Sequence, residues 1–419
     1  MTYRTFILIT ILSLLMASLA YGGTPSVPVI IKTAERANIQ QLATSLGGTV
    51  VDWIPEADTY LLNVTNVPAL QSSLLAGIEW AEPNVVVSLD PIYLQGIVGL
   101  PAGKASHWYL QQPAWQMIQA DEAQQVSSGQ GTIVADINSA VDASHPAIAG
   151  HLVGGYDFVA NKPAGAAALD QSSASFMDQS SASFMDQSSA SFMDQSSASF
   201  MDQSSASFMD ATGTAYAHGT LCVGIIAAMA PQSMIMPLRV FDEQGRADTF
   251  TIAKAIRYAA KNGSQVINMS FGTLSPSNAL KSAVEFAQKS GAILVASAGN
   301  HNTNQPQYPA ALSGVIAVAA TDLMDRKASF SNYGGSVFTD APGDKIFSAF
   351  PGNLYAVVSG TSFSAPAVAA IAGLIRNQRA SHIDDIIVRA SVNIDAKNPN
   401  YAGQLGHGRI NALSAVKQK

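Results

Sequence analysis

Cysteine is almost absent from this chain, which holds only Cys222 among 419 residues. A single thiol excludes an intramolecular disulfide in any compartment. Charged residues are also scarce, at 12% against 48% hydrophobic residues, which leaves ample material for a large buried core. The net charge is −7, and the aspartates of one repeated insert carry most of it. Because the chain has no surplus of positive charge, we expect no nucleic-acid partner.

Long apolar runs are lacking as well, apart from one near the N-terminus. Arg4 precedes an apolar run from Phe6 to Ala20 that ends in small residues. This run is short for a bilayer span but suits the core of a secretory signal, so residues 1–22 are interpreted as a signal peptide. An uncleaved membrane anchor is the alternative. After cleavage of the signal we expect a secreted or periplasmic protein without membrane attachment.

Two regions of different pattern follow the signal. Residues 27–90 alternate strand and helix patterns in the order βαββαβ, which predicts a small α+β domain with its helices on one face of the sheet. Residues 91–105 are polar and contain Gly and Pro, and are interpreted as a linker. Residues 106–419 alternate short apolar runs with amphipathic stretches, which predicts a doubly wound parallel α/β sheet. In such sheets, sites form at the carboxyl ends of the strands.

A repeat interrupts the second region. The octapeptide DQSSASFM occurs five times without change at residues 170–209. A period of eight keeps equivalent side chains on one face of an extended strand, which favours an extended or turn-rich surface insert. The Ser-rich composition fits disorder equally well. We interpret the insert as a tolerated repeat expansion, with a recognition arm as the alternative.

Three motifs carry groups suited to nucleophilic catalysis. In SGTSFSAPAVAAIAGLI, Ser362 stands at the start of an apolar helix, where the helix dipole favours developing negative charge. In AHGTLCVGIIAAMAP, His218 precedes a Gly-Thr helix start and can act as a general base. In GAILVASAGNHN, Asn300 follows an apolar strand, and its side-chain amide can donate to an oxyanion. Taken singly, His218 and Asn300 are equally well explained as core and turn residues.

Together these motifs closely resemble the subtilisin-like serine peptidases. The resemblance covers about residues 106–415 and includes APQSMIMPLRVFD, VINMSFG, FSNYG, APGDKIFSA and GHGRINALSAV. It implies a serine endopeptidase in which Ser362 is the nucleophile, His218 the general base and Asn300 the oxyanion donor. It also implies that residues 27–90 are an inhibitory propeptide and folding chaperone, removed by a cut between about residues 90 and 106.

The resemblance further implies where a polypeptide substrate binds. One tripeptide matches the family's edge segment, which pairs with the substrate backbone, and another matches the opposite wall of the main specificity pocket. These are Ser270-Phe271-Gly272 and Ser297-Ala298-Gly299, respectively. We expect a monomer without a cofactor or metal. Calcium sites are common in the family, but no acidic loop here has clear ligand spacing, so none is assigned.

The third member of the family's triad is an aspartate at the end of the first strand of the sheet. Both flanks of ADINSAVDASHP place it at position 138, which is asparagine. Asp142 falls at an ordinary turn position. Asp136 lies two residues earlier on the same strand face and could substitute only if the strand slipped or bulged.

An asparagine at this position weakens the predicted triad. An amide is neutral and can present its NH₂ group to the wrong nitrogen of the histidine, and such a change lowers kcat about 10⁴-fold in serine peptidases. Two functions therefore stay open. The first is a secreted serine endopeptidase slowed by Asn138, and the second is a subtilisin-like protein with an impaired triad that binds peptides or proteins.

Overall fold

A computed structural model describes residues 26–35, 37–65, 77–99, 105–164, 211–378 and 382–418. The predicted signal peptide, the DQSSASFM repeats and nearly all of the second helix predicted for residues 66–77 lie outside these ranges. The chain divides into two compact units. One comprises residues up to Val86 with Asp248–Lys254 and Ser275–Ala283, and the other comprises the remainder.

The N-terminal unit holds a four-stranded antiparallel sheet in the order β2-β3-β1-β4. Its elements are β1 (Val27–Thr33), α2 (Ile39–Ser45), β2 (Gly48–Ile54), the 3₁₀ turn η2 (Pro55–Ala57), β3 (Thr59–Val64) and β4 (Ile78–Pro83). Asn38 caps α2 by accepting from two backbone N–H groups. Leu42 and Leu46 of this region pack into a core with strand residues such as Val29 and Leu62. The predicted order of strands and first helix is therefore found.

The same unit includes the first turns of α9 (Thr249–Lys261) and α10 (Asn278–Lys289). The buried carboxylate of Glu82 accepts from Ser277 Oγ at 2.6 Å and from the backbone N–H groups of Asn278 at 2.7 Å and Ala279 at 3.0 Å. Burial raises the pKa of Glu82, and these hydrogen bonds oppose the rise. A carboxylate thus stabilises the start of α10, where unpaired N–H groups need an acceptor.

The C-terminal unit is built on a ten-stranded sheet, counted within the described residues, in the order β18-β19-β15-β14-β13-β12-β7-β10-β8-β9. Neighbouring strands from β19 to β8 run parallel, and β18 and β9 are antiparallel edges. Every residue of β12 and β14 is buried, so both faces of the sheet are covered, as in doubly wound folds. The predicted fold class is confirmed.

The strands of this sheet are β7 (Ile133–Asn138), β8 (Gly155–Asp157), β9 (Lys162–Ala164), β10 (Met234–Arg239), β12 (Val266–Met269), β13 (Ile293–Ser297), β14 (Val315–Thr321), β15 (Thr339–Pro342), β18 (Ser391–Val392) and β19 (Arg409–Ile410). Two short strands, β5 (Val86–Ser88) and β11 (Arg246–Asp248), lie outside it.

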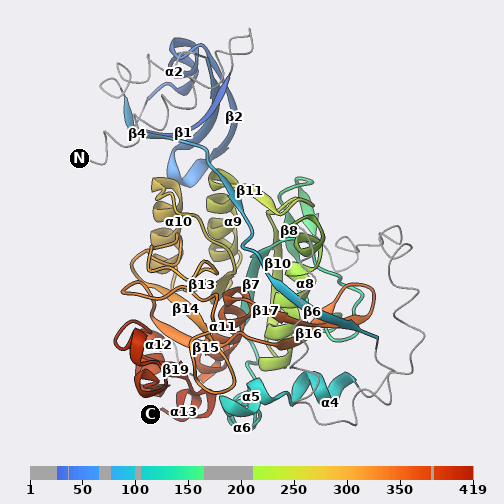
Figure 1. Cartoon of the computed structure of the whole chain (residues 1–419). Helices are drawn as coiled ribbons and strands as arrows, with labels where there is room; N and C mark the ends of the chain where they lie inside the picture. Colours follow the sequence, from blue (N-terminus) through green and yellow to red (C-terminus); the bar gives the residue numbers. More distant parts are fainter. Residues whose placement is uncertain are drawn as a thin grey trace. The chain divides into compact units, whose positions relative to one another are not determined.

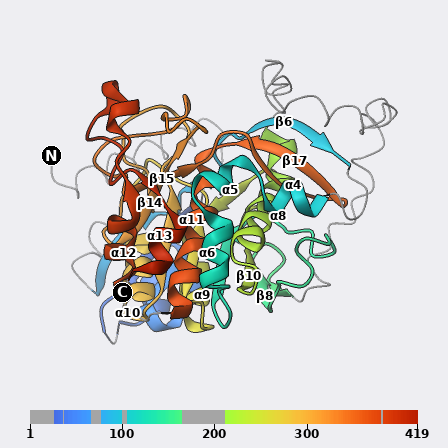
Figure 2. The same ribbon diagram turned by 90° about the horizontal axis from the view of Figure 1, so that it is seen from below.

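Two long helices, α8 (Ala211–Met229) and α11 (Thr361–Gln378), lie side by side on one face of the sheet (Figures 1 and 2). The helix α8 packs on β7 and β10, whereas α11 packs on β12, β13 and β14. All side chains of α11 from Thr361 to Ile375 are buried, which explains why its sequence is apolar or small on every side. No helix in the described ranges is both long enough and apolar enough to cross a membrane.

Shorter helices complete the C-terminal unit. Figure 2 shows α6 and α13 beside α11, and α13 contacts both of the other two. The remaining elements are α4 (Ala105–Leu110), α5 (Pro113–Met117), α6 (Ala120–Val126), α12 (Ile383–Ala390), α13 (Ala412–Lys417) and the 3₁₀ turns Asp395–Lys397 and Pro399–Tyr401.

The segment predicted as a linker contains a strand instead. β6 (Tyr93–Val98) pairs antiparallel with β17 (Leu354–Ser359), which pairs in turn with β16 (Ile346–Phe350). The linker prediction for residues 91–105 is therefore wrong for this strand. The partner that orders it lies more than 250 positions away in the chain, so the residues around it contain no sign of the pairing.

Candidate active site

The four residues predicted for catalysis come from two strand ends, from the start of α11 and from the interior of α8, so the prediction that a helix starts just after His218 is wrong. Asn138 is the last residue of β7, and Asn300 follows β13 by three residues. His218 belongs to α8, and Ser362 is the second residue of α11. The carboxyl ends of β7 and β13 meet at one edge of the parallel sheet, where this class of fold places its sites.

His218 is held by the side chain of Asn138. The distance between His218 Nδ1 and Asn138 Oδ1 is 2.7 Å, and the same oxygen accepts the backbone N–H of Ser139 at 2.8 Å. A carbonyl oxygen only accepts, so Nδ1 carries the proton and Nε2 presents a lone pair. The alternative in which the amide NH₂ group faces the histidine is not found. Burial lowers the pKa of His218 to about 4, so its ring is neutral at pH 7.

Asp136 does not take the place of Asn138. β7 pairs with β10 and β12 in unbroken register, so the strand neither slips nor bulges at this point. The Asp136 carboxylate is fully buried and accepts from Asn268 Nδ2 at 2.7 Å. Burial raises its pKa to about 7, against the effect of this hydrogen bond. Asp136 therefore lies on the side of Asn138 that faces away from His218.

Asp142 has the ordinary turn role that its position predicts. Its Oδ1 accepts from the backbone N–H of Ser144 at 3.0 Å and from Ser144 Oγ at 2.6 Å. Its Oδ2 accepts the backbone N–H of Gly352 at 2.9 Å. Each hydrogen bond of its carboxylate thus closes a loop.

The start of α11 is tied to the neighbouring elements through Ser362. Pro366, four residues later, has no N–H group, so the Ser362 carbonyl lacks its usual helical partner. Ser270 Oγ at 2.9 Å and Cys222 Sγ at 3.4 Å donate to that carbonyl instead. Ser362 Oγ donates to the Ser270 carbonyl at 3.3 Å, and His218 Nε2 has no partner within the described part of the chain.

Cys222 is a packing residue in this arrangement. Its thiol is fully buried in the core between α8 and α11. Burial raises its pKa well above the usual value, so the thiol stays protonated and is a poor nucleophile. Its Sγ lies 3.8 Å from His218 Nδ1.

Asn300 has the geometry of an oxyanion donor. Its Oδ1 accepts both the backbone N–H and the Oγ1 hydroxyl of Thr361, each at 2.8 Å. These two donors fix the amide so that Nδ2 points away from the helix. Nδ2 donates to the carbonyl of Pro91 at 3.0 Å. An amide that is oriented in advance towards a peptide carbonyl can stabilise the charge that develops on its oxygen.

Replacing Asn300 with alanine is expected to lower kcat for peptide hydrolysis about 10²–10³-fold, with little change in KM, because the donor acts mainly on the transition state. Steady-state kinetics on a peptide substrate measure both constants. Asn262→Ala is a matched control, because Asn262 is exposed just after α9 and its Nδ2 donates to the Tyr258 carbonyl at 2.8 Å. A rise in KM at constant kcat would instead assign Asn300 to ground-state binding.

A segment of the chain itself occupies the groove around Pro91. On one side, the backbone N–H of Leu89 donates to the Gly245 carbonyl at 2.9 Å. On the other side, β6 continues as an edge strand on β17. The carboxyl group of Asp90, between them, is buried, and burial raises its pKa to about 6, an effect opposed by His301. An extended peptide is thus held on both sides of the Asn300 amide.

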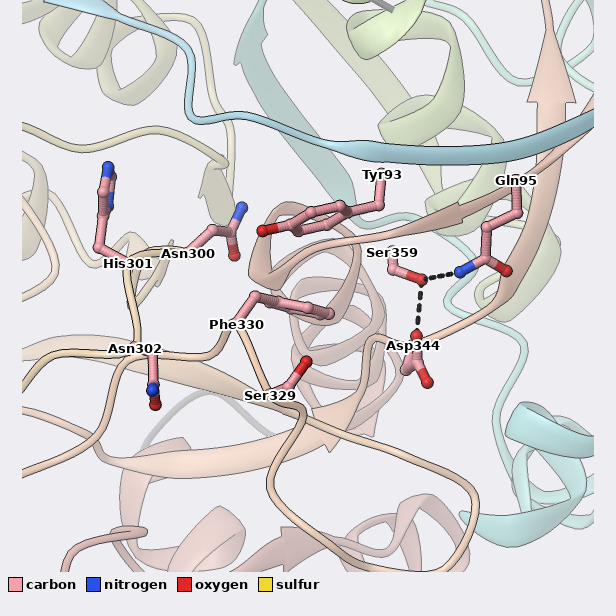
Figure 3. Close-up of a pocket in the computed structure, with 9 residues that line it drawn as sticks. All are labelled: Tyr93, Gln95, Asn300, His301, Asn302, Ser329, Phe330, Asp344 and Ser359. Atoms are coloured by element: carbon pink, nitrogen blue, oxygen red, sulfur yellow. Dashed lines mark hydrogen bonds between the residues drawn. The ribbon is translucent and has the colours of Figure 1, made fainter. Parts of the chain in front are cut away.

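A cavity of ≈ 410 Å³ lies beyond Pro91, and Figure 3 shows the side chains that line it. The rings of Tyr93 and Phe330 pack with centroids 5.3 Å apart. Gln95 Nε2 donates to Ser359 Oγ at 2.9 Å, and that hydroxyl donates to Asp344 Oδ1 at 2.7 Å (Figure 3). The cavity has room for side chains that follow the segment's point of contact with Asn300.

The two predicted walls of the specificity pocket face a side chain that the sequence did not single out. Gln307 is buried, and a Cβ built on Gly272 or Gly299 would lie 2.5 Å or 2.4 Å from its Oε1. Gln307 Nε2 lies 3.2 Å from His301 Nδ1. The amide therefore fills the space between the walls and makes it polar. No local pattern around Gln307 indicates this, because its place depends on the fold.

The fold and the site together define the class of α/β serine hydrolases, in which a serine, a histidine and an amide donor meet at a sheet edge. The family model described as the Subtilase family matches residues 129–408, and the chain belongs to this family of serine peptidases. Thermitase of Thermoactinomyces vulgaris is 34% identical over 313 residues, covering 72% of this chain and 94% of that protein. A thermophilic serine proteinase of Bacillus sp. (strain AK1) is 32% identical over 400 residues, covering 93% and 86%, respectively.

Two solved structures share the fold. Fervidolysin from Fervidobacterium pennivorans, a keratinolytic enzyme related to subtilisin, superposes with a TM-score of 0.69 at 20% identity. The match covers 95% of this chain, which spans 62% of the fervidolysin chain. A mutant form of the epidermin leader peptide processing serine protease from Staphylococcus aureus gives a TM-score of 0.68 at 16% identity, covering 94% of this chain and 100% of that chain.

Proposed function

We propose that this chain is a secreted or periplasmic serine endopeptidase that is made as a precursor and is slowed by Asn138. One observation carries the proposal. The Asn300 amide, fixed by Thr361 next to Ser362, donates to the Pro91 carbonyl, and Asn138 holds His218 in the productive tautomer. Membership of the subtilase family supports the same reaction class.

The chemistry follows from the positions of these groups. Ser362 Oγ forms a bond to the carbonyl carbon of the substrate, and its proton passes to His218 Nε2. Asn300 Nδ2 donates to the resulting oxyanion. The imidazolium then gives its proton to the leaving amine as the C–N bond breaks, and a water molecule hydrolyses the acyl-enzyme by the same route. Asn138 Oδ1 accepts the Nδ1–H bond throughout, but as a neutral group it stabilises the imidazolium less than a carboxylate would.

Residues 27–90 then act as a propeptide, and the segment that follows is the first substrate. The groove-bound residues from Leu89 to Val98 support this, because an extended segment held on both sides of its contact with Asn300 blocks access for other peptides. The predicted signal at residues 1–22 supports export. The cut is expected next to Pro91, within the range of residues 90–106 set by the sequence.

Mass spectrometry of the purified precursor and its Ser362→Ala variant tests this proposal. The unchanged chain is expected to lose about its first ninety residues, whereas the variant, about 10²-fold slower, stays whole over the same period, because it has no hydroxyl at position 362 to form the acyl-enzyme. An added protease that trims both proteins shows that the segment is open to cleavage in each. If both precursors stay whole on their own under these conditions, the proposal is rejected.

The second candidate is a protein that binds peptides or another partner in the groove without turnover. The neutral Asn138 favours it, as does the bond from Ser362 Oγ to the Ser270 carbonyl in place of a bond to His218. Intact precursors in the experiment above, together with tight peptide binding once the added protease has trimmed the N-terminal segment, are the results expected from this candidate.

A further inference from the structure

Asp136, Asn138 and His218 form a line of buried polar groups behind the nucleophile. Asp136 and Asn138 are two residues apart on β7 and therefore share one face of the strand. Asn138 Nδ2 lies 3.5 Å from Asp136 Oδ1, while Asn138 Oδ1 lies 2.7 Å from His218 Nδ1. The amide thus has a carboxylate on one side and the imidazole on the other.

We infer that Asp136 is a positioning residue of this site, and that its carboxylate acts on His218 through the side chain of Asn138. The inference rests on the proposed function, because it assigns to Asp136 the negative charge that the serine mechanism needs and that position 138 lacks.

The orientation of the Asn138 amide explains how a distant carboxylate can act. The reversed amide would direct Nδ2 at the N–H of Ser139 and at the protonated Nδ1 of His218, so donors would face donors. It would also direct Oδ1 at the Asp136 carboxylate, where two acceptors would repel. The ionised Asp136 and the Ser139 N–H therefore select the same orientation, in which the histidine keeps its lone pair on Nε2.

A second path leads from Asp136 to the nucleophile. Asn268 Nδ2 donates to Asp136 Oδ1 at 2.7 Å and also lies 3.0 Å from Ser270 Oγ, which accepts from it. Ser270 Oγ in turn donates to the Ser362 carbonyl at 2.9 Å. The same carboxylate therefore anchors both the base and the backbone of the nucleophile.

No proton reaches Asp136 in the proposed step. The proton of Ser362 Oγ moves to His218 Nε2. Nδ1 keeps its own proton, which stays hydrogen-bonded to Asn138 Oδ1. The imidazolium carries one positive charge, and the ionised Asp136 supplies the negative charge behind the amide. In a site closed to water this charge acts strongly on the imidazolium, because the surroundings screen it poorly.

Ionisation of Asp136 gives the site a pH dependence of its own. The titratable groups that face it from α8 are Cys222 and His218, while β12 contributes only the neutral Asn268. On the other side of β7, Arg239 of β10 is paired with Asp157 of β8 at 3.3 Å. Burial places the pKa of Asp136 at about 7 and that of His218 at about 4, and it raises that of the Cys222 thiol. Asp136 is thus the group in this cluster whose charge changes near neutral pH.

Kinetics over a range of pH test the inference. In the full chain, kcat is expected to fall as the pH drops through the Asp136 pKa and to level off about tenfold lower, because the protonated form lacks the charge behind the amide. Asp136→Asn is expected to lower kcat about tenfold at pH 8 and to remove this step, with KM unchanged. Asp340→Asn is the matched control, because Asp340 is a fully buried aspartate on β15, away from the site. A purely structural role would lower kcat equally at every pH and would overturn the inference.

Nitrogen NMR of His218 provides a readout that needs no turnover. In the Ser362→Ala chain, labelled on histidine, the Nδ1–H form is expected to predominate, with a shift of its resonances centred near pH 7. Asp136→Asn in the same background is expected to remove that shift. If this variant does not fold, the presence or absence of the shift in the Ser362→Ala chain that keeps Asp136 decides the test. Absence of the shift, or its persistence in a folded Asp136→Asn chain, would overturn the inference. A shift in a protein that shows no hydrolysis would reject the proposed function but not the inference on Asp136.

Discussion

Replacing Asn138 with aspartate is expected to raise kcat for peptide hydrolysis about 10²–10³-fold. The new carboxylate would accept the Nδ1–H bond of His218 with a full negative charge and would stabilise the imidazolium directly. The gain stays below the 10⁴-fold loss known for the reverse change, because that loss includes a wrong histidine tautomer. Here the Ser139 N–H already enforces the correct one. Steady-state kinetics at pH 8 measure the change.

The buried Asp136 limits this gain. Two carboxylates on the same face of β7 would repel each other, so one of them would hold its proton to a higher pH. We therefore expect the double variant Asn138→Asp/Asp136→Asn to be the fastest of the series near neutral pH. Asn262→Asp is the control, because it makes the same amide-to-acid change at an exposed position just after α9. Equal rates for Asn138→Asp and the unchanged chain would show that the charge at position 138 does not limit turnover.

Replacing Ser362 with alanine is expected to have very different effects in two backgrounds. In serine peptidases of this family, loss of the serine or the whole triad costs about 2 × 10⁶-fold in kcat, and loss of the acid alone about 3 × 10⁴-fold. The natural chain already lacks the acid, so Ser362→Ala should cost it only about a further 10²-fold. In the Asn138→Asp chain, the same replacement should cost about 10⁴–10⁵-fold, because the groups act as a unit.

This difference between backgrounds is measured by four rates on one peptide substrate, from the natural chain, each single variant and the double variant. A Ser364→Ala change is the control, because Ser364 Oγ donates to the Ala341 carbonyl at 3.1 Å and points away from the groove. If Ser362→Ala had the same effect in both backgrounds, Ser362 and position 138 would act independently, and the mechanism proposed here would be wrong.

Much of the fold followed from patterns within single segments. Short apolar runs ending in polar residues predicted β7, β12 and β13, and their carboxyl ends indicated where Asn138 and Asn300 would lie. The motif around Ser362 predicted a buried helix, and the helix is α11. These predictions succeeded because a strand buried on both faces and a buried helix each give a pattern that a short stretch of neighbouring residues shows.

The predictions that failed or were absent depend on partners that are distant in the sequence. Whether Asn138 presents its oxygen or its nitrogen to His218 is decided by Ser139 and by the position of α8. The direction of the Asp136 carboxylate is set by Asn268 on the neighbouring strand. Gln307 lies between the two predicted walls of the specificity pocket only because its loop returns to Gly272 and Gly299. A strand pattern alone contains none of this information.

The groove-bound segment changes what a slow active site can achieve. Because the segment belongs to the same molecule, its cleavage is a first-order event whose rate does not depend on protein concentration. A typical kcat of about 10 s⁻¹, reduced by about 10²–10³-fold, still gives one cut per molecule within about 10² s. Each turnover of a separate peptide substrate would take as long as this first cut. Such peptides would also compete with the tethered segment until it dissociates. Under the proposed function, the chain has time to mature, and its later rate of hydrolysis is set by how far Asn138 slows the reaction.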